Sequence, residues 1–176
     1  MRMIRKAKWD DIDGVSQIFL HIIEEEENGN GSTGWKRNIY PTKETAAAAL
    51  EKNDLFVMEE AGMIIAAMRL NQEQVPEYSM CQWEYPAEDN QVMVMHTLVV
   101  DPRAKRHGCG RMMVEFYENY AKEKHCPYLR IDTNEINMRA RNMYKKFGFK
   151  EVGIVPCSFN GIEHVNLVCI EKKLEL

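Results

Sequence analysis

The stretch that decides the fold runs from Val92 to Arg111 and reads VMVMHTLVV, then DP, then RAKRHGCGR. Its first nine residues contain no helix breaker and are rich in β-branched side chains, which predicts a strand over 92–100. Pro102 ends this strand, because proline has no amide hydrogen to donate to a neighbouring strand. Apolar residues at helical spacing then predict a helix over about 108–125. The residues expected on the buried face of that helix are Met112, Met113, Phe116, Tyr120 and Ala121.

The turn between this strand and this helix is suited to an anion. The first turn of a helix presents amide hydrogens that have no partner within the helix, together with a partial positive charge. Gly108 and Gly110 let a bulky anion approach the backbone, because neither carries a Cβ atom. Lys105, Arg106 and Arg111 add positive charge around the same point. We therefore predict a phosphate or pyrophosphate site, the alternative being an ordinary tight turn.

The spacing of the glycines excludes two common phosphate-binding motifs. A P-loop requires Lys-Ser or Lys-Thr after its second glycine, and Gly110 is followed by Arg111. A dinucleotide fingerprint requires a third small residue three positions later, where this chain has Met113. The segment KRHGCG at 105–110 instead resembles the pyrophosphate loop of the GNAT superfamily of N-acetyltransferases, Gln/Arg-x-x-Gly-x-Gly/Ala. Lys105 stands where that family usually has Gln or Arg.

A second segment, at 137–149, strengthens the resemblance. We predict a strand over 128–131 and, after it, a helix with Asn134 as its N-cap that stops at Gly148. The helix region resembles the family pattern Asn-x-x-Ala-x-x-Leu-Tyr-x-x-x-Gly-Phe. The matching residues are Asn137, Ala140, Tyr144, Gly148 and Phe149. The resemblance is specific over about residues 90–155 and looser over the rest of the chain.

The resemblance implies a fold and a co-substrate. The implied fold is α+β with α/β/α layers: a central mixed, mostly antiparallel sheet of six to seven strands with a splayed parallel pair, flanked by about four helices. The implied co-substrate is acetyl-CoA, with no metal. The residues that the resemblance assigns to coenzyme binding are Leu98, Val99, Val100, Lys105, Arg106, His107, Gly108, Cys109, Gly110, Arg111 and Asn137.

Length and composition limit the other possibilities. A chain of 176 residues fits one domain, so we expect a single acetyltransferase domain over 1–176. The formal net charge of −4 argues against nucleic-acid binding. No apolar run approaches the roughly 18 residues of a membrane span, and no signal-peptide core is present. Five scattered cysteines suggest free thiols in a reducing compartment, so a cytoplasmic location without a membrane partner is expected.

The remaining elements follow from periodicity and turn chemistry. A strand is predicted over 3–7, a helix over 10–24, and a helix from N-cap Thr42 to about Lys52. The acidic run at 24–27 is expected to be a solvated, fraying helix end. The alternative is that its negative charge attracts a cationic amine substrate. Two hairpins are expected, with turns at Ala61-Gly62 and Asn160-Gly161. Their strands are predicted at 55–59 and 63–70, and at 149–155 and 165–174.

Acetyl transfer to an amine requires a group that removes a proton. An alkylamine has a pKa near that of lysine, about 10.4, and is protonated at neutral pH. Strand alternation places His96 on one face of 92–100 with apolar neighbours, and the family often has a Glu or His on this face. We predict His96 as the general base, the alternative being a hydrogen-bonded core histidine. Glu84 and Glu88 are the reserve candidates.

The resemblance also assigns the general acid. In the family, a tyrosine at the position of Tyr144 reaches the thiol sulfur, and a phenol can donate a proton without being ionised at pH 7. The alternative for Tyr144 is core packing, because it lies on the apolar stripe of its helix. Direct transfer is the habit of the family, so an acyl intermediate on Cys109 is not expected.

The acceptor itself is not identified by the sequence. The Gly-rich loop 28–41 carries Trp35 and Tyr40, which by resemblance line the acceptor pocket or, alternatively, fill the edge of the core. The polar insertion 71–90 covers either the acceptor site or a subunit contact, as in a homodimer. We expect a small-molecule amine or a peptide amine as acceptor. The alternative function is a catalytically silent acyl-CoA-binding regulatory or interaction module.

Overall fold

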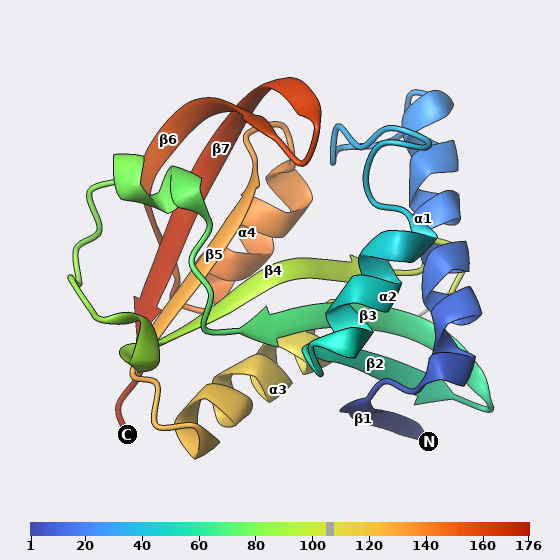
Figure 1. The fold of residues 1–176 in the computed structure, drawn as a ribbon, viewed down its shortest axis with the longest axis horizontal. Helices are drawn as coiled ribbons and strands as arrows, with labels where there is room; N and C mark the ends of the chain where they lie inside the picture. The colour runs from blue at the N-terminus through green and yellow to red at the C-terminus, as the bar shows by residue number, and fades with distance from the viewer. Residues whose placement is uncertain (105–107) are drawn as a thin grey trace. The chain divides into compact units, whose positions relative to one another are not determined.

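The computed structural model describes residues 1–104 and 108–176. Its α-helices are α1 (Ile12–Glu27), α2 (Lys43–Glu51), α3 (Cys109–Glu123) and α4 (Met138–Lys146). Its strands are β1 (Arg2–Lys6), β2 (Leu55–Glu60), β3 (Met63–Asn71), β4 (Val92–Val100), β5 (Tyr128–Asn134), β6 (Lys150–Phe159) and β7 (Ile162–Lys173). The seven strands form one sheet in the order β1-β2-β3-β4-β5-β7-β6 (Figure 1).

The sheet is mixed, as predicted. Strands β4 and β5 are parallel, with Val92 opposite Tyr128 and Met95 opposite Ile131. The pairs β1–β2, β2–β3, β5–β7 and β6–β7 are antiparallel. The predicted fold class, a mostly antiparallel sheet with one parallel pair and about four helices, is confirmed.

Both predicted hairpins have the turn that their sequences favour. Ala61 and Gly62 have φ of 51° and 78°, and Asn160 and Gly161 have φ of 52° and 78°. Two successive residues with positive φ define the type I′ turn, whose twist matches that of the flanking strands. Each turn is a two-residue connection, between β2 and β3 and between β6 and β7.

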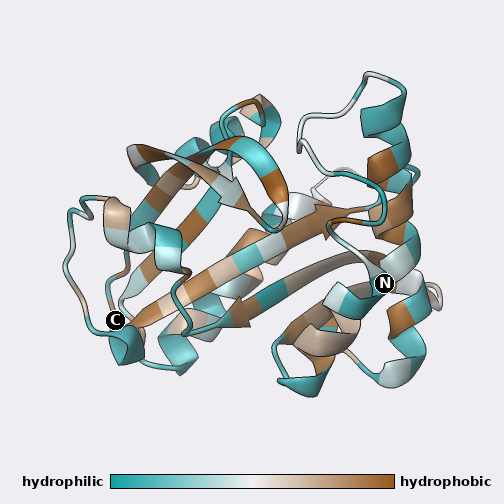
Figure 2. Ribbon diagram, turned by 45° about the horizontal axis from the view of Figure 1, so that its top comes forward, coloured by the Kyte–Doolittle hydropathy of each residue, from teal (hydrophilic) through white to brown (hydrophobic). Residues whose placement is uncertain are grey.

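The chain divides into two compact units. The first comprises Met1–Gly31, Trp35–Leu70 and His96–Phe116. Within it, the apolar side of α1 packs with α2 on one face of the strands, and Figure 2 shows the apolar residues of α1 recurring among polar ones. The residues of this core are Ile12, Val15, Ile18, Phe19, Ala46, Ala49, Leu55, Val57, Ala67 and Val99.

Helix α3 supplies the opposite layer in the first unit. Phe56 lies between Leu55 and Val57 in β2, so strand alternation directs it to the other face. Its ring meets that of Phe116 of α3, with ring centroids 5.3 Å apart. Within this unit the strands are therefore covered on both faces, as the predicted α/β/α layering requires.

The second unit comprises Ser32–Gly34, Asn71–Met95 and Tyr117–Leu176. Within it, the insertion 71–90 packs along one face of β5. Three of its aromatic residues meet alternate residues of β5, in reverse order along the chain. Tyr85 stacks on Tyr128 with centroids 5.7 Å apart, the Arg130 guanidinium lies 4.2 Å from the Trp83 ring centre, and the Tyr78 hydroxyl donates to Asp132 at 2.7 Å. The insertion is therefore fastened to the protein's own sheet, and Figure 1 shows it (green) passing β6 and β7.

Two details of the helices differ from the prediction. The acidic run 24–27 is not a frayed end: it is helical, and the Glu27 carboxylate accepts two hydrogen bonds from Arg37, at 2.8 and 2.9 Å. In α3 the fully buried residues include Val114 and Tyr117, which were not expected. The residues Met112, Phe116 and Tyr120 are only partly buried, because the side of α3 that is most enclosed is rotated from the predicted stripe.

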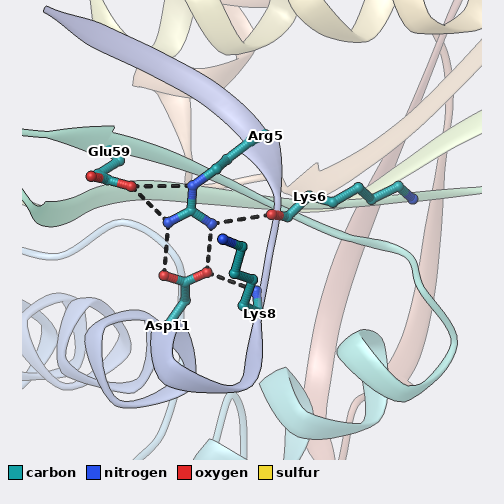
Figure 3. A network of polar contacts seen from close by, with 5 residues as sticks. All are labelled: Arg5, Lys6, Lys8, Asp11 and Glu59. Atoms are coloured by element: carbon teal, nitrogen blue, oxygen red, sulfur yellow. Dashed lines mark hydrogen bonds and ion pairs between the residues drawn. The ribbon is translucent and has the colours of Figure 1, made fainter.

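A partly buried ion network fixes β1 to the start of α1 in the first unit (Figure 3). The Arg5 guanidinium donates to both oxygens of Asp11, at 2.7 and 3.0 Å, and to Glu59 at 2.7 and 3.1 Å. The Lys8 amide donates to Asp11 at 2.7 Å. Because Arg5 hydrogen-bonds the Asp11 carboxylate, it lowers the pKa of Asp11 below its usual value of 3.8.

We expect Asp11→Asn to lower the free energy of unfolding by about 2 kcal/mol at pH 7, because two charge-assisted hydrogen bonds lose their charge. The folded-state pKa of Asp11 is depressed, so this contribution is complete above pH 3.8 and is lost as the pH falls through the folded pKa. Urea unfolding of both proteins between neutral and strongly acidic pH measures the difference.

The matched control for this variant is Asp13→Asn, which removes an exposed ion pair between Asp13 of α1 and Lys43 of α2. That change is expected to cost less than about 0.5 kcal/mol. A loss at Asp11 no larger than the loss at Asp13, or one that persists unchanged in acid, would contradict the prediction.

Candidate active site

The turn that follows β4 is tied to helix α1. The Asp101 amide donates to the Ile65 carbonyl at 2.9 Å, and the Asp101 carboxylate accepts from the Arg103 amide at 2.9 Å. Asp101 Oδ1 also lies 2.9 Å from His21 Nδ1 of α1. The Arg103 guanidinium pairs with Glu24, also on α1. The exit from β4 is therefore held by two side-chain contacts to one helix.

Helix α3 begins directly beyond this turn, at the predicted glycines. Gly108 has φ of +84°, a conformation that favours glycine, and a Cβ atom placed on it would meet no atom of the described residues within 4 Å, its chain neighbours apart. The Met112 amide donates to the Gly108 carbonyl at 3.0 Å, so the amides of Gly110 and Arg111 precede the first α-helical hydrogen bond. Open space above a left-handed glycine at a helix start fits the phosphates of a coenzyme. Lys105, Arg106 and His107, predicted to bind the same phosphates, lie outside the described residues.

The side chains of the turn do not all face the same surroundings. Cys109 is buried, with 1% exposure, so its thiol is enclosed by the protein and only its backbone is suited to a ligand contact. Arg111 is exposed and forms an ion pair with Glu115 at 2.8 Å. The predicted coenzyme contacts of both residues stay predictions.

The second half of β4 has two different faces. Val99 is 2% exposed and belongs to the core beneath α1 and α2. His96, Leu98 and Val100 are half-buried, and strand alternation places them on the opposite face from Val99. The predicted base is therefore turned away from the face that α1 and α2 cover. Its role, and the predicted main-chain contacts of residues 98–100, stay predictions.

The two aromatic residues of the 28–41 loop pack on the α1 side. The Tyr40 hydroxyl is hydrogen-bonded to the Thr97 hydroxyl at 2.9 Å. The Trp35 ring meets the Tyr40 ring edge-on, with centroids 5.8 Å apart, and packs against the α1 core. Thr97 alternates with His96 along β4, so Tyr40 lies on the face opposite to the predicted base. These contacts favour a role at the core edge, and acceptor binding by Trp35 and Tyr40 stays a prediction.

Helix α4 begins later than predicted. Asn134 is not its N-cap: it is the last residue of β5, and its side chain accepts from the Ile136 amide at 3.2 Å. The N-cap is Asn137, whose Oδ1 accepts from the Ala140 amide at 3.2 Å. The strand continues to Asn134 because its backbone pairs with Leu167 of β7. The family's Asn-x-x-Ala spacing is thus a helix cap here, and coenzyme binding by Asn137 stays a prediction.

The remaining residues of the family motif, from Tyr144 to Phe149, form the C-terminal end of α4. Gly148 has φ of +82°, and its amide donates to the Lys145 carbonyl at 3.0 Å. The Phe149 amide donates to the Tyr144 carbonyl at 3.1 Å, and their rings lie 5.9 Å apart. This pair of hydrogen bonds with an apolar contact is a Schellman motif. The Tyr-x-x-x-Gly-Phe spacing therefore fixes the backbone and ring of Tyr144.

Tyr144 is held as a neutral phenol. Its side chain is buried, with 5% of the residue exposed. Burial raises the pKa of Tyr144 above its ordinary range, and the charge of Asp132 raises that pKa further. A phenol in this state keeps its proton at neutral pH and can donate it to a departing thiolate.

Asp132 is an ionisable residue that the sequence analysis missed. It is half-buried in β5, and its Oδ2 accepts the hydrogen bond from Tyr78. Burial raises the pKa of Asp132 to about 7, although the hydrogen bond from Tyr78 lowers that pKa. The available signal was a pair of charged residues, Arg130 and Asp132, alternating with the apolar residues Leu129 and Ile131. Their partners in the insertion could not be known from that pattern.

The reserve candidates for the base have other contacts. The Glu84 carboxylate forms an ion pair with Lys150 at 2.6 Å, and the Glu84 amide donates to Glu171 at 2.5 Å. Glu88 is exposed, and its amide donates to the Gln91 side chain at 3.3 Å. Glu84 and Glu88 are both exposed, whereas Asp132 is half-buried.

Residues 1–104 and 108–176 contain neither a cluster of metal ligands nor a membrane-spanning helix. In that part of the chain, no three His, Cys, Asp or Glu side chains gather as a metal site. Over the same residues, no helix combines the length and the apolar character needed to cross a membrane.

Comparison with known proteins decides the family. Residues 19–149 match the family model described as the Acetyltransferase (GNAT) family. The chain belongs to the GNAT acetyltransferase family. The GNAT resemblance of the 105–110 and 137–149 segments is thereby confirmed, and acetyl-CoA-dependent acetylation is the activity of the family.

Relatives of this GNAT protein agree with that assignment. The chain is 23% identical over 150 residues to the uncharacterized N-acetyltransferase YhfO of Bacillus subtilis (strain 168), covering 84% of this chain and 89% of that protein. A GNAT-family acetyltransferase structure from Streptococcus agalactiae 2603 has a TM-score of 0.78 at 18% identity, covering 99% of this chain and 96% of that one. The structure of yncA, a putative acetyltransferase from Salmonella typhimurium with its cofactor acetyl-CoA, has a TM-score of 0.73 at 14% identity, covering 100% of this chain and 95% of that one. These structures share the fold of the GNAT protein described here.

Proposed function

We propose that this GNAT protein is an N-acetyltransferase that moves the acetyl group of acetyl-CoA directly to a primary amine while both substrates are bound. The observation that carries the proposal is the start of α3, where Gly108 at φ +84° leaves open space at a helix N-terminus directly after β4. Membership of the family supplies the identity of the anion. Strand β4 and helix α3 both run from one unit into the other, which supports a single catalytic domain over 1–176.

The proposed coenzyme contacts follow from the chemistry of this segment. The amides of 108–111 hold the pyrophosphate, with Lys105, Arg106 and Arg111 adding positive charge. The backbone of 98–100 pairs with the pantetheine arm. When bound, acetyl-CoA supplies an acyl thioester that an amine can attack.

The proposed proton transfers use two residues. His96 removes a proton from the attacking amine, because imidazole is the side chain best suited to exchange protons near neutral pH. Tyr144 gives its proton to the departing thiolate; burial keeps the phenol protonated at neutral pH until the thiolate forms. The acceptor is an amine of a small molecule or a peptide, and the protein works in the cytoplasm, alone or as a homodimer.

Two measurements test this function against a silent coenzyme-binding module. Acetyl-CoA is expected to raise the melting temperature of the protein, whereas ATP and NAD at the same concentration leave it unchanged. A panel of primary amines is then screened for release of free thiol from acetyl-CoA. Thiol release with at least one amine supports the enzyme, and stabilisation without release for any amine would favour the module.

We expect His96→Ala to lower turnover at pH 7 by about 10- to 100-fold and to remove the acidic limb that this histidine contributes to the pH–rate profile. The control is His164→Ala, which removes a histidine whose side chain is 96% exposed. Turnover is measured by thiol release between acidic and alkaline pH. An acidic limb of unchanged shape would show that His96 is not the base.

A further inference from the structure

The face of β5 beneath the insertion carries an ionisable group that the proposed reaction does not yet use. Alternation along β5 directs Tyr128, Arg130 and Asp132 to the same face, and each meets an aromatic residue of the insertion. The first two contacts are a ring stack and a cation–π contact, which hold the segment in place. The third is different, because it presents a carboxylate to a phenol.

The two oxygens of Asp132 have different surroundings. Oδ2 accepts the Tyr78 hydroxyl at 2.7 Å. Oδ1 accepts no hydrogen bond from the described residues, and it is not among their enclosed polar atoms that lack a partner. One oxygen is therefore held by Tyr78, and the other is not fully enclosed and has no hydrogen-bond donor among the described residues. The hydroxyl is itself held, because the Tyr78 residue is 2% exposed and its ring meets that of Trp83 with centroids 5.0 Å apart.

No described cation neutralises this carboxylate within its own unit. Within this unit, the described groups whose charge or hydrogen bonds couple to Asp132 are all neutral or acidic. They are Glu77 and Tyr78 of the insertion, Tyr144 of α4, Cys157 of β6 and Cys169 of β7. A carboxylate in such surroundings attracts a cation and readily accepts a proton.

An alkylammonium acceptor must lose two protons during acetylation. The first must leave before attack, because an ammonium nitrogen has no free electron pair. The second leaves the nitrogen as the new carbon–nitrogen bond forms. His96, as proposed above, accounts for one of these protons and leaves the other without an acceptor.

We propose that Asp132 is a catalytic proton acceptor that takes the first proton from the ammonium group of the acceptor, with Tyr78 positioning its carboxylate. This inference rests on the proposed function and deepens it, because it places the amine at the face of β5 beneath the insertion. It also gives the insertion a role: it brings Tyr78 to Asp132.

The proposed steps balance in atoms and charge. The ammonium nitrogen gives one proton to Asp132 Oδ1 and becomes a neutral amine. Its electron pair forms the bond to the thioester carbon, the carbon–sulfur bond breaks, and the sulfur takes the proton of Tyr144. His96, the base of the proposed function, takes the second proton from the nitrogen and releases it to water, and the Tyr144 oxygen regains a proton from water. Asp132 then loses its proton to solvent, so one proton is released in each cycle.

The structure supports this role through the ionisation of the group as well as its position. Burial raises the pKa of Asp132 to about 7, so near neutral pH the carboxylate can both accept a proton and release it. The hydrogen bond from Tyr78 lowers this pKa and keeps a larger share of Asp132 ionised.

The decisive experiment compares Asp132→Asn with wild type on two acceptors of the same shape. One is a primary alkylamine found in the amine panel, and the other is its alkoxyamine analogue, which is already neutral at pH 7. We expect kcat/KM for the alkylamine to fall about 100-fold and kcat/KM for the alkoxyamine to change by less than about threefold. The Kd of acetyl-CoA is expected to be unchanged. His96→Ala, in contrast, is expected to lose activity on both acceptors.

A second variant keeps the test decisive if Asp132→Asn fails to fold. Tyr78→Phe removes the hydrogen bond that lowers the pKa of Asp132, so the acidic limb of the pH–rate profile should move to higher pH. Tyr85→Phe is the matched control, because it removes a hydroxyl of the same insertion and keeps the ring stack on Tyr128. That variant is expected to leave the limb in place.

The outcomes separate the two proposals. If wild type acetylates amines but Asp132→Asn loses equal activity on both acceptors, or none on either, this inference is overturned and the proposed function stands. This inference is also overturned if the acidic limb of the pH–rate profile does not move in Tyr78→Phe. The same holds if the limb moves as far in Tyr85→Phe as in Tyr78→Phe. If wild type releases no thiol with any amine, the proposed function fails, and this inference fails with it.

Discussion

Gly108→Val is expected to abolish acetyl-CoA binding, raising its Kd by more than about 1,000-fold. Two effects combine. A β-branched residue at φ +84° is strained, at a cost of about 1–2 kcal/mol, which displaces the first turn of α3. The valine side chain also enters the open space above the backbone, where we propose that the pyrophosphate lies. Isothermal titration with acetyl-CoA measures the affinity directly.

The chain offers a closely matched control for this variant. Gly62, in the β2–β3 turn, has φ of +78°, and an added Cβ atom there would also meet nothing within 4 Å. Gly62→Val should therefore cost similar stability and leave the Kd of acetyl-CoA unchanged. If Gly108→Val bound acetyl-CoA as tightly as Gly62→Val does, the turn would not be the coenzyme site.

Tyr144→Phe is expected to lower kcat about 1,000-fold and to change the Kd of acetyl-CoA by less than about twofold. The substitution removes only the phenolic proton. The ring contact with Phe149, at 5.9 Å, and the cap at Gly148 are retained, so the fold should be preserved. Steady-state thiol release gives kcat, and titration calorimetry gives the affinity for acetyl-CoA.

A second buried tyrosine serves as the control. The Tyr117 hydroxyl is hydrogen-bonded to the Met93 carbonyl at 2.6 Å and lies 3.2 Å from the Arg130 carbonyl. Tyr117→Phe should lower the free energy of unfolding by about 1 kcal/mol and leave kcat within about threefold of wild type. Tyr144 would lose its proposed role as general acid if its variant behaved like that of Tyr117.

The predictions from sequence succeeded where neighbouring residues determine the structure. The strand 92–100 matches β4, and the two-residue turns at Ala61-Gly62 and Asn160-Gly161 have the positive φ values that their sequences favour. They were less accurate at boundaries. Asn134 was a reasonable N-cap by residue type, but pairing with Leu167, which is remote in the sequence, extended β5 and moved the cap to Asn137.

The same distinction between local and distant determinants applies to the candidate site. The glycine turn and the family motif at 137–149 were enough to predict a coenzyme segment and a role for Tyr144, and both stay predictions. Asp132 was not predicted as a site residue, because its partner Tyr78 lies 54 positions away in a segment without periodicity. The packing of the 71–90 insertion could not be predicted for the same reason. Its side chains contact β5, and such contacts between distant segments leave no pattern in the local sequence.

The sequence by itself determined the strand–turn–helix around Gly108, the cap that fixes Tyr144, and the family. Each of these depends on backbone preferences and spacings within a few residues, which the order of amino acids states directly. Only the tertiary structure decided which face of β4 Tyr40 lies on, what the insertion covers and which carboxylate is poised near neutral pH. These depend on burial and on partners brought together from distant parts of the chain, because desolvation, which sets the pKa of a group such as Asp132, arises only when those parts pack.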